Sequence, residues 1–219
     1  MTYNDFLAFW RGGAMVGLLC AAVLLGAGSE ASAQGPASAG RAKSAVCAGC
    51  HGADGNSINP LWPSLAGQHA DYTARQLRAY QAGDRSDVLM STFAANLTAA
   101  DIADLAAYFE TQMLTPKGAD PDLVTTGEHI YRGGIAERGV AACIACHGPA
   151  GRGNPLAGYP SVSGQHAGYI VNTLRAYAAG ERRSDASMNL MMRDLAALLS
   201  EAEMQAVASY MQGLHGATN

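Results

Sequence analysis

Aromatic residues make up only 7% of this 219-residue chain, and charged residues only 15%. Hydrophobic residues reach 49%, a balance that excludes a disordered chain. The net charge of −4 argues against nucleic acid as a partner and is too small to identify a protein partner. No segment shows a convincing apolar–polar alternation of the kind that predicts a β-strand, so a helical fold is expected. With so few aromatics, two domains of about 100 residues each would have thin cores.

A hydrophobic run of membrane-spanning length is also missing. The apolar stretch from Ala14 to Gly28 has about 15 residues, whereas a membrane span needs about 20. It follows Arg11 and precedes the small residues Ala31-Ser32-Ala33, a pattern typical of a secretory signal with its cleavage site. Residues 1–33 are therefore predicted to be a signal peptide that is removed together with Cys20. Retention of this segment as an anchor is the alternative.

The four remaining cysteines form two copies of Cys-x-x-Cys-His, namely Cys47-Ala-Gly-Cys50-His51 and Cys143-Ile-Ala-Cys146-His147. This is the attachment sequence for a c-type haem, in which two thiols bond to the porphyrin and the histidine binds the iron. A zinc ribbon would place its cysteine pairs about 15–20 residues apart, and a thioredoxin-like pair would need a βαβ setting. The motifs therefore predict two covalently bound haem c groups with His51 and His147 as iron ligands. Two porphyrins also supply the apolar bulk that thin cores lack.

The two halves of the chain repeat each other. Corresponding residues keep the same order with a nearly constant shift: His51 with His147, Pro63 with Pro160, Gln68 with Gln165, Tyr72 with Tyr169, and Leu77-Arg78-Ala79-Tyr80 with Leu174-Arg175-Ala176-Tyr177. Two prolines and a glycine between Thr115 and Pro121 mark a linker. The predicted domains are residues 34–117 and 118–219.

Each domain is predicted to hold about three helices and long loops, which makes the fold all-α. A middle helix is expected at residues 70–82 and again at 167–179, each followed by a glycine stop. The last helix is expected to begin at Thr98 and, in the second copy, at Ser200, each with an acidic residue three positions later as in a capping box. A short helix should lead into each haem motif. Loops of this length need something to wrap around, and one covalent haem per domain supplies it.

The sixth iron ligand decides the chemistry, because an open iron can react with oxygen or peroxide whereas a thioether closes the site. Met90 lies eight residues before the start of the last helix, and Met192 holds the same position in the second copy. These two methionines are the predicted ligands. Met188 and Met191 compete with Met192 because they lie in the same loop. The alternative for all of them is a role as flexible core fillers.

With these motifs and this repeat, the chain resembles the dihaem cytochrome c4 family, which is built of two class I cytochrome c domains. The resemblance covers essentially all of the chain after residue 33. Its first-copy segments are Val46-Cys47-Ala48-Gly49-Cys50-His51-Gly52, Asp54-Gly55-Asn56, Pro63-Ser64-Leu65-Ala66-Gly67-Gln68 and Ile102-Ala103-Asp104-Leu105-Ala106-Ala107-Tyr108-Phe109. Its second-copy segments are Tyr131-Arg132-Gly133-Gly134, Ala142-Cys143-Ile144-Ala145-Cys146-His147-Gly148, Gly158-Tyr159-Pro160, Gly164-Gln165-His166 and Met192-Arg193.

The resemblance implies histidine–methionine ligation at both haems, a periplasmic location and electron delivery to terminal oxidases. It also implies that the carbonyls of Pro63 and Pro160 accept hydrogen bonds from the iron-bound histidines. The alternative is that these are two ordinary turn prolines. His69 and His166 are expected to be surface or helix-start residues that do not bind iron. Two roles are open for the repeated pairs Arg78 with Arg175 and Tyr80 with Tyr177. Their side chains contact haem propionates or the other domain, or they occupy ordinary solvated positions on a helix.

The expected function is that of a soluble or loosely membrane-associated electron carrier, with no catalytic residues. Its partners would be a donor and an acceptor redox protein, with cytochrome bc1 and a terminal oxidase as the candidates. One alternative is a dihaem electron-transfer subunit of a larger oxidoreductase, such as a flavoprotein dehydrogenase. Another is a dihaem peroxidase, which needs one open iron; the matched methionines argue against it.

Overall fold

The computed structural model describes residues 35–215, and the predicted signal peptide with Cys20 lies outside the described residues. This part of the chain holds helices and two isolated β-bridges but no strand, which confirms the all-α fold. The first half contains α1 (Ala37–Lys43), α2 (Ala45–His51), α3 (Ala70–Ala82), α4 (Val88–Ala95) and α5 (Ala99–Glu110). The second half contains α6 (Pro121–Gly133), α7 (Ile144–His147), α8 (Ala167–Ala178), α9 (Met191–Ala196) and α10 (Glu201–Gly213), with short 3₁₀ turns between them. None of the helices in this described part is long and apolar enough to cross a membrane.

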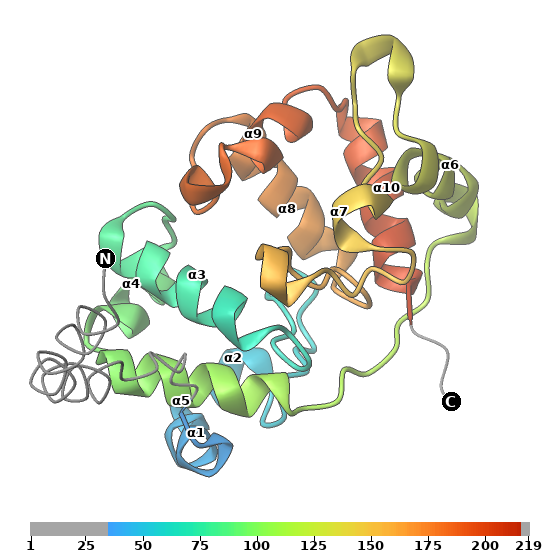
Figure 1. The fold of residues 1–219 in the computed structure, drawn as a ribbon. Helices are drawn as coiled ribbons and strands as arrows, with labels where there is room; N and C mark the ends of the chain where they lie inside the picture. Colours follow the sequence, from blue (N-terminus) through green and yellow to red (C-terminus); the bar gives the residue numbers. More distant parts are fainter. Residues whose placement is uncertain (1–34, 216–219) are drawn as a thin grey trace, which may run out of the picture. The chain divides into compact units, whose positions relative to one another are not determined.

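In each half the first helix packs against the last, α1 against α5 and α6 against α10 (Figure 1). The crossing point requires a glycine in both cases. A Cβ atom on Gly40 would lie 1.9 Å from the backbone oxygen of Asp104, and one on Gly127 would lie 2.1 Å from that of Ala206. The two backbones therefore come closer than any side chain allows, and the duplication predicted from the sequence recurs as a duplicated helix crossing.

The last helices begin where the capping-box pattern places them. The Thr98 hydroxyl accepts from the Asp101 N–H at the start of α5, and the Ser200 hydroxyl accepts from the Glu203 N–H at the start of α10. In both boxes the acidic side chain in turn accepts a hydrogen bond from the backbone N–H of the capping residue. The predicted helix starts are confirmed.

The segments that carry Met90 and Met192 were expected to be loops, and that expectation is wrong. Met90 lies in the first turn of α4, and Met192 lies in α9. The α4 sequence is apolar apart from Ser91 and Thr92 and lacks helical periodicity, so the pattern did not reveal it. The start of α9 is held from a distance, because the Asp185 carboxylate accepts from the Met192 N–H at 3.0 Å. A cap seven residues away leaves no local sequence signal.

Replacing Ser200 with alanine should lower the free energy of unfolding by about 1 kcal/mol, the usual value for losing a helix N-cap. The matched control is Gln205→Ala on the exposed face of the same helix, which should change it by less than about 0.5 kcal/mol. Denaturant titration of both variants measures the difference. Equal stability of the two variants would show that the capping box does not stabilise α10.

The same box predicts a pH dependence. The Ser200 N–H is the main cause of a Glu203 pKa below its ordinary value of 4.5, with the Ser200 hydroxyl and Arg138 assisting. A carboxyl whose folded-state pKa is lowered stabilises the protein above the unfolded-state pKa and loses that contribution as the pH falls through the folded-state pKa. Replacing Glu203 with glutamine removes the ionisable group, so the difference in the free energy of unfolding between Glu203→Gln and wild type should be full at pH 7 and shrink below about pH 4.

Candidate haem-binding site

A cavity of about 880 Å³ reaches both haem motifs. It is lined by all of the predicted covalent and proximal residues: Cys47, Cys50, His51, Cys143, Cys146 and His147. Both motifs lie on or against short helices, α2 and α7, so cysteines three residues apart share a helix face and the histidine closes the helix. All four cysteines are free and partly exposed. The structure thus brings together what the sequence places 96 residues apart.

The thiols do not resemble a zinc site. Burial raises the pKa of Cys143 to about 11, and burial also raises the pKa of Cys47, with the neighbouring Cys50 adding to it. Metals bind the thiolate form, which such shifts disfavour. Within residues 35–215 no group of three or more histidine, cysteine or acidic side chains is arranged to hold a metal ion.

The two histidines are buried and held in one tautomer. His51 Nδ1 lies 2.8 Å from the Pro63 carbonyl oxygen, and His147 Nδ1 lies 2.9 Å from that of Pro160. A carbonyl can only accept, so Nδ1 must carry the proton and Nε2 must keep its lone pair. Burial lowers the pKa of both imidazoles, outweighing the opposing effect of the proline carbonyls. Each histidine is therefore neutral at pH 7 with Nε2 free, the form in which imidazole binds iron.

The methionines face the same cavity. Met90 and Met192 line it, and so do their competitors Met188 and Met191. Their position at the cavity therefore does not distinguish Met192 from Met188 and Met191. Backbone hydrogen bonds do distinguish it, because Met192 shares one with Met90. The Met90 N–H donates to the Asp87 carboxylate at 2.8 Å, and the Met192 N–H donates to the Asp185 carboxylate at 3.0 Å.

The cavity wall fits a large group that is mostly apolar. Several apolar side chains on it remain unusually exposed: Val46 at 58%, Leu61 at 56%, Leu89 at 56% and Phe93 at 49%. Exposed apolar side chains gathered around one cavity indicate a binding surface for an apolar ligand. The same wall carries buried polar atoms without a protein partner, Thr73 Oγ1, Arg75 Nε, Gln76 Nε2 and Asp185 Oδ1. A porphyrin with polar substituents meets both requirements.

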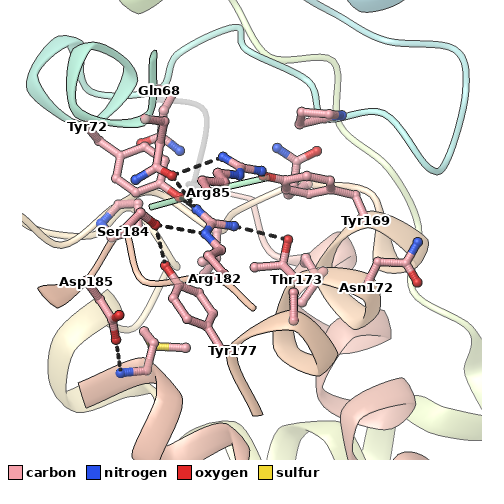
Figure 2. A pocket seen from close by; sticks show the side chains of 18 of the residues that line it. Gln68, Tyr72, Arg85, Tyr169, Asn172, Thr173, Tyr177, Arg182, Ser184 and Asp185 are labelled. Atoms are coloured by element: carbon pink, nitrogen blue, oxygen red, sulfur yellow. Dashed lines mark hydrogen bonds between the residues drawn. The ribbon is translucent and has the colours of Figure 1, made fainter. Parts of the chain in front are cut away.

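Two arginines from the two halves meet at this wall (Figure 2). Arg182 is 2% exposed and donates to the Tyr72 hydroxyl at 2.7 Å, while Arg85 donates to the Tyr169 hydroxyl at 2.8 Å. Both guanidinium groups also donate to Gln76 Oε1, at 2.7 and 3.0 Å. Each arginine therefore bonds to the tyrosine of the other half, and the contacts repeat as the sequence does.

Each guanidinium also stacks on a tyrosine of its own half. Arg85 lies 4.7 Å from the centre of the Tyr80 ring, and Arg182 lies 4.6 Å from that of Tyr177. Among the described residues, neither arginine forms an ion pair with a carboxylate. Buried charges in proteins are ordinarily paired. Two cations at the cavity wall without a protein counter-ion fit a cofactor that brings its own carboxylates, as haem does through its propionates.

Arg85 and Arg182 were not among the residues predicted from the sequence, although the repeat contains a signal for them. They follow Gly83 and Gly180 by two residues each, so they belong to the same repeat. Tyr80 and Tyr177 prove to be buried beside these arginines, whereas Arg175 is exposed and pairs with Glu201.

The two helix-start histidines cap α3 and α8 as expected, but His166 is not a surface residue. It is 8% exposed, and its Nε2 lies 2.7 Å from the Ser57 carbonyl oxygen in the other half. His69 makes the equivalent contact with the Arg152 carbonyl oxygen at 2.7 Å. These histidines join the two halves, a role that only the tertiary structure reveals.

Comparison with known proteins agrees with this site. The Cytochrome c family model matches residues 37–112 and 136–215. Cytochrome c4 of Pseudomonas aeruginosa is 44% identical over 191 residues, which cover 87% of this chain and 94% of that protein. The crystal structure of cytochrome c4 from Pseudomonas stutzeri is 42% identical with a TM-score of 0.80, covering 83% of this chain and 100% of that one. A thiosulfate dehydrogenase from Marichromatium purpuratum is 33% identical with a TM-score of 0.69, covering 81% of this chain but 40% of that one. The chain therefore belongs to the cytochrome c family and, within it, to the dihaem cytochromes c4, electron carriers with one covalent haem c in each of two domains.

Proposed function

We propose that this protein carries electrons in the periplasm through two haems, one ligated by His51 and Met90 and the other by His147 and Met192. Each bound haem supplies a one-electron ferric–ferrous couple. The observation that supports the ligand set most strongly is the pair of buried, neutral imidazoles with free Nε2 atoms, in one cavity with both methionines. The domain boundaries proposed with it are residues 34–117 and 118–219, after a signal peptide at 1–33.

Around each proposed centre the chain has three tasks. The proline carbonyl fixes the orientation of the histidine ring and increases its basicity as a ligand. The apolar cavity wall excludes water, which raises the reduction potential and limits side reactions. The methionine thioether would bind the iron from the chain's own side and leave no site for oxygen or peroxide. A single cavity that reaches both motifs supports electron transfer between the two centres.

Backbone contacts favour Met192 over its neighbours as the second methionine ligand. Asp87 and Asp185 each hold the N–H of one methionine, Met90 in one half and Met192 in the other. Met188 ends the preceding 3₁₀ turn and is followed by two residues with positive φ, which separate it from the helix. Met191 has no such bond among the described contacts of Asp185.

The ferric protein should show the near-infrared band of thioether-to-iron charge transfer with the intensity of two haems. Absorbance spectroscopy of the purified, fully oxidised protein tests this directly. Full intensity would support methionine at both irons. Half intensity would leave one centre with another ligand, and complete absence of the band would overturn the proposed ligation.

The predicted export signal supports a periplasmic location. We also propose that the protein associates peripherally with the membrane. We place the protein between a respiratory donor, with cytochrome bc1 as the candidate, and a terminal oxidase as the acceptor. Fractionation locates it, and oxidase-dependent reoxidation of the reduced protein in membrane preparations tests the acceptor. Release into the periplasmic fraction with rapid reoxidation is the expected result, and reoxidation that is insensitive to oxidase inhibitors would contradict it.

A second candidate role is that of a dihaem electron-transfer subunit of a larger oxidoreductase. The thiosulfate dehydrogenase neighbour favours it, because this chain matches only 40% of that longer chain. A flavoprotein dehydrogenase is one example of such a larger oxidoreductase. Affinity purification from the native host at low salt separates the two roles. A stoichiometric second protein would support the subunit role, and recovery of the dihaem protein alone would support the free carrier.

A further inference from the structure

Two glutamines join the halves of the protein through paired hydrogen bonds. The Gln165 side chain accepts from the Ser64 N–H at 2.9 Å and donates to the Ser64 carbonyl at 2.8 Å. The Gln68 side chain makes the same pair of bonds with Ser161, accepting at 3.0 Å and donating at 2.8 Å. Each glutamine side chain therefore forms hydrogen bonds with both the backbone N–H and the backbone carbonyl of one serine in the opposite half.

These two serines, Ser64 and Ser161, directly follow the prolines that contact the haem histidines. The Ser64 N–H and the Pro63 carbonyl belong to one peptide group, and that carbonyl lies 2.8 Å from His51 Nδ1. The Ser161 N–H and the Pro160 carbonyl form the equivalent peptide group, 2.9 Å from His147 Nδ1. A continuous hydrogen-bond chain therefore runs from each histidine, through one peptide group, to the glutamine of the other half.

We infer that each glutamine is a positioning residue for the iron ligand of the opposite domain: Gln165 acts on His51, and Gln68 acts on His147. The inference rests on the ligation proposed above. A peptide group whose N–H donates a hydrogen bond is polarised, so its carbonyl becomes a stronger acceptor. The stronger acceptor draws on the histidine Nδ1 proton and makes the imidazole a more basic ligand. A more basic ligand favours ferric iron, so each glutamine lowers the reduction potential of the haem in the other domain.

Burial favours this reading at Gln165 in particular. Ser64 is 3% exposed and Gln165 is 9% exposed, so water has little access to replace the amide if it is removed. Gln68 is only half-buried, and solvent can replace part of its effect. The Gln165 effect on the N-terminal haem should therefore be the larger of the two.

The test uses the complete dihaem protein and the variants Gln165→Leu and Gln68→Leu, which keep the side-chain volume and remove both polar groups. The midpoint potential of each haem is measured by spectroelectrochemistry, and the Nδ1 proton of each histidine is followed by NMR in the ferrous protein. Polarisation strengthens a hydrogen bond by about 10–30%. The expected change in the ferric–ferrous equilibrium is about 1.5- to 3-fold, or about 10–30 mV at 59 mV per tenfold change for one electron.

The expected pattern is crossed. Gln165→Leu should raise the potential of the N-terminal haem and shift the His51 proton, with the C-terminal haem unchanged, and Gln68→Leu should do the reverse. The matched control is His69→Ala, which removes another bond between the halves, to the Arg152 carbonyl, without touching a proline–serine peptide group. It should leave both potentials at the wild-type values.

Several outcomes would overturn the inference. These are a shift of the haem in the substituted domain, equal shifts of both haems, no shift, or the same shifts in His69→Ala. If the leucine variants fail to fold, Gln165→Glu keeps the acceptor for the Ser64 N–H, and a raised N-terminal potential in that variant would equally contradict it. A wild-type protein without the thioether band refutes the proposed ligation. A wild-type protein with the band, but without a crossed shift in the variants, refutes only this inference.

Discussion

Replacing Met90 with alanine is expected to lower the potential of the N-terminal haem on the order of 0.1–0.2 V, within the roughly 0.8 V that axial ligands span. A thioether favours ferrous iron, and water or a nitrogen base in its place favours ferric iron. The near-infrared band of the ferric protein should lose half its intensity. The C-terminal haem should keep its potential, because its ligands come from the other half of the chain.

Met192→Ala should give the mirror-image result at the C-terminal haem. The matched controls are Met188→Ala and Met191→Ala, which change neighbouring methionines on the same cavity wall. Both controls should keep the full band and both potentials. Loss of half the band in either control, with Met192→Ala unaffected, would transfer the ligand role to that methionine.

Arg182→Met should destabilise the protein by about 3 kcal/mol, because removing one member of a buried, hydrogen-bonded charge network leaves its partners unsatisfied. The Tyr72 hydroxyl and Gln76 Oε1 would each lose a bond of 2.7 Å. Methionine keeps most of the buried stem, so the cost reports the guanidinium group and not a cavity. Loss of a cation from the cavity wall should also lower the reduction potentials, since positive charge disfavours ferric iron.

The adjacent residue supplies the control for this prediction. Arg183 is exposed, and Arg183→Met should change the free energy of unfolding by less than about 0.5 kcal/mol and leave both potentials unaltered. Denaturant titration and spectroelectrochemistry of both variants give the comparison. If Arg182→Met proves as stable as Arg183→Met, the hydrogen bonds of Arg182 to Tyr72 and Gln76 do not stabilise the fold. If its reduction potentials equal those of Arg183→Met, Arg182 does not serve as a counter-charge for the bound cofactor.

Features with a local signal were predictable from the sequence. The Cys-x-x-Cys-His motifs predict the two haems, and the capping boxes predict that the last helices begin at Thr98 and Ser200. The middle helix of the first half runs from Ala70 to Ala82, as the pattern predicts. In each case the residues that determine the feature lie within a few positions of one another, so a single chain segment carries the information.

Features made by contacts between distant segments were not predictable in the same way. The α9 helix depends on Asp185, and the arginine network joins Arg182 to Tyr72 across 110 positions. The bonds of Gln165 to Ser64 span 101 positions. The repeat marked several of these residues as paired, but it could not show that each one contacts the opposite half. Sequence periodicity reports which face of a helix is buried, and not what covers that face.

The central claim is that both irons are six-coordinate histidine–methionine centres that exchange one electron each. A redox titration of the complete protein, followed at the thioether charge-transfer band and at the haem absorption maxima, tests it most directly. Two one-electron transitions are expected, each of which removes half of the band as its iron becomes ferrous. A centre that titrates without any change in the band, or an iron that binds peroxide or carbon monoxide readily at neutral pH, would contradict it.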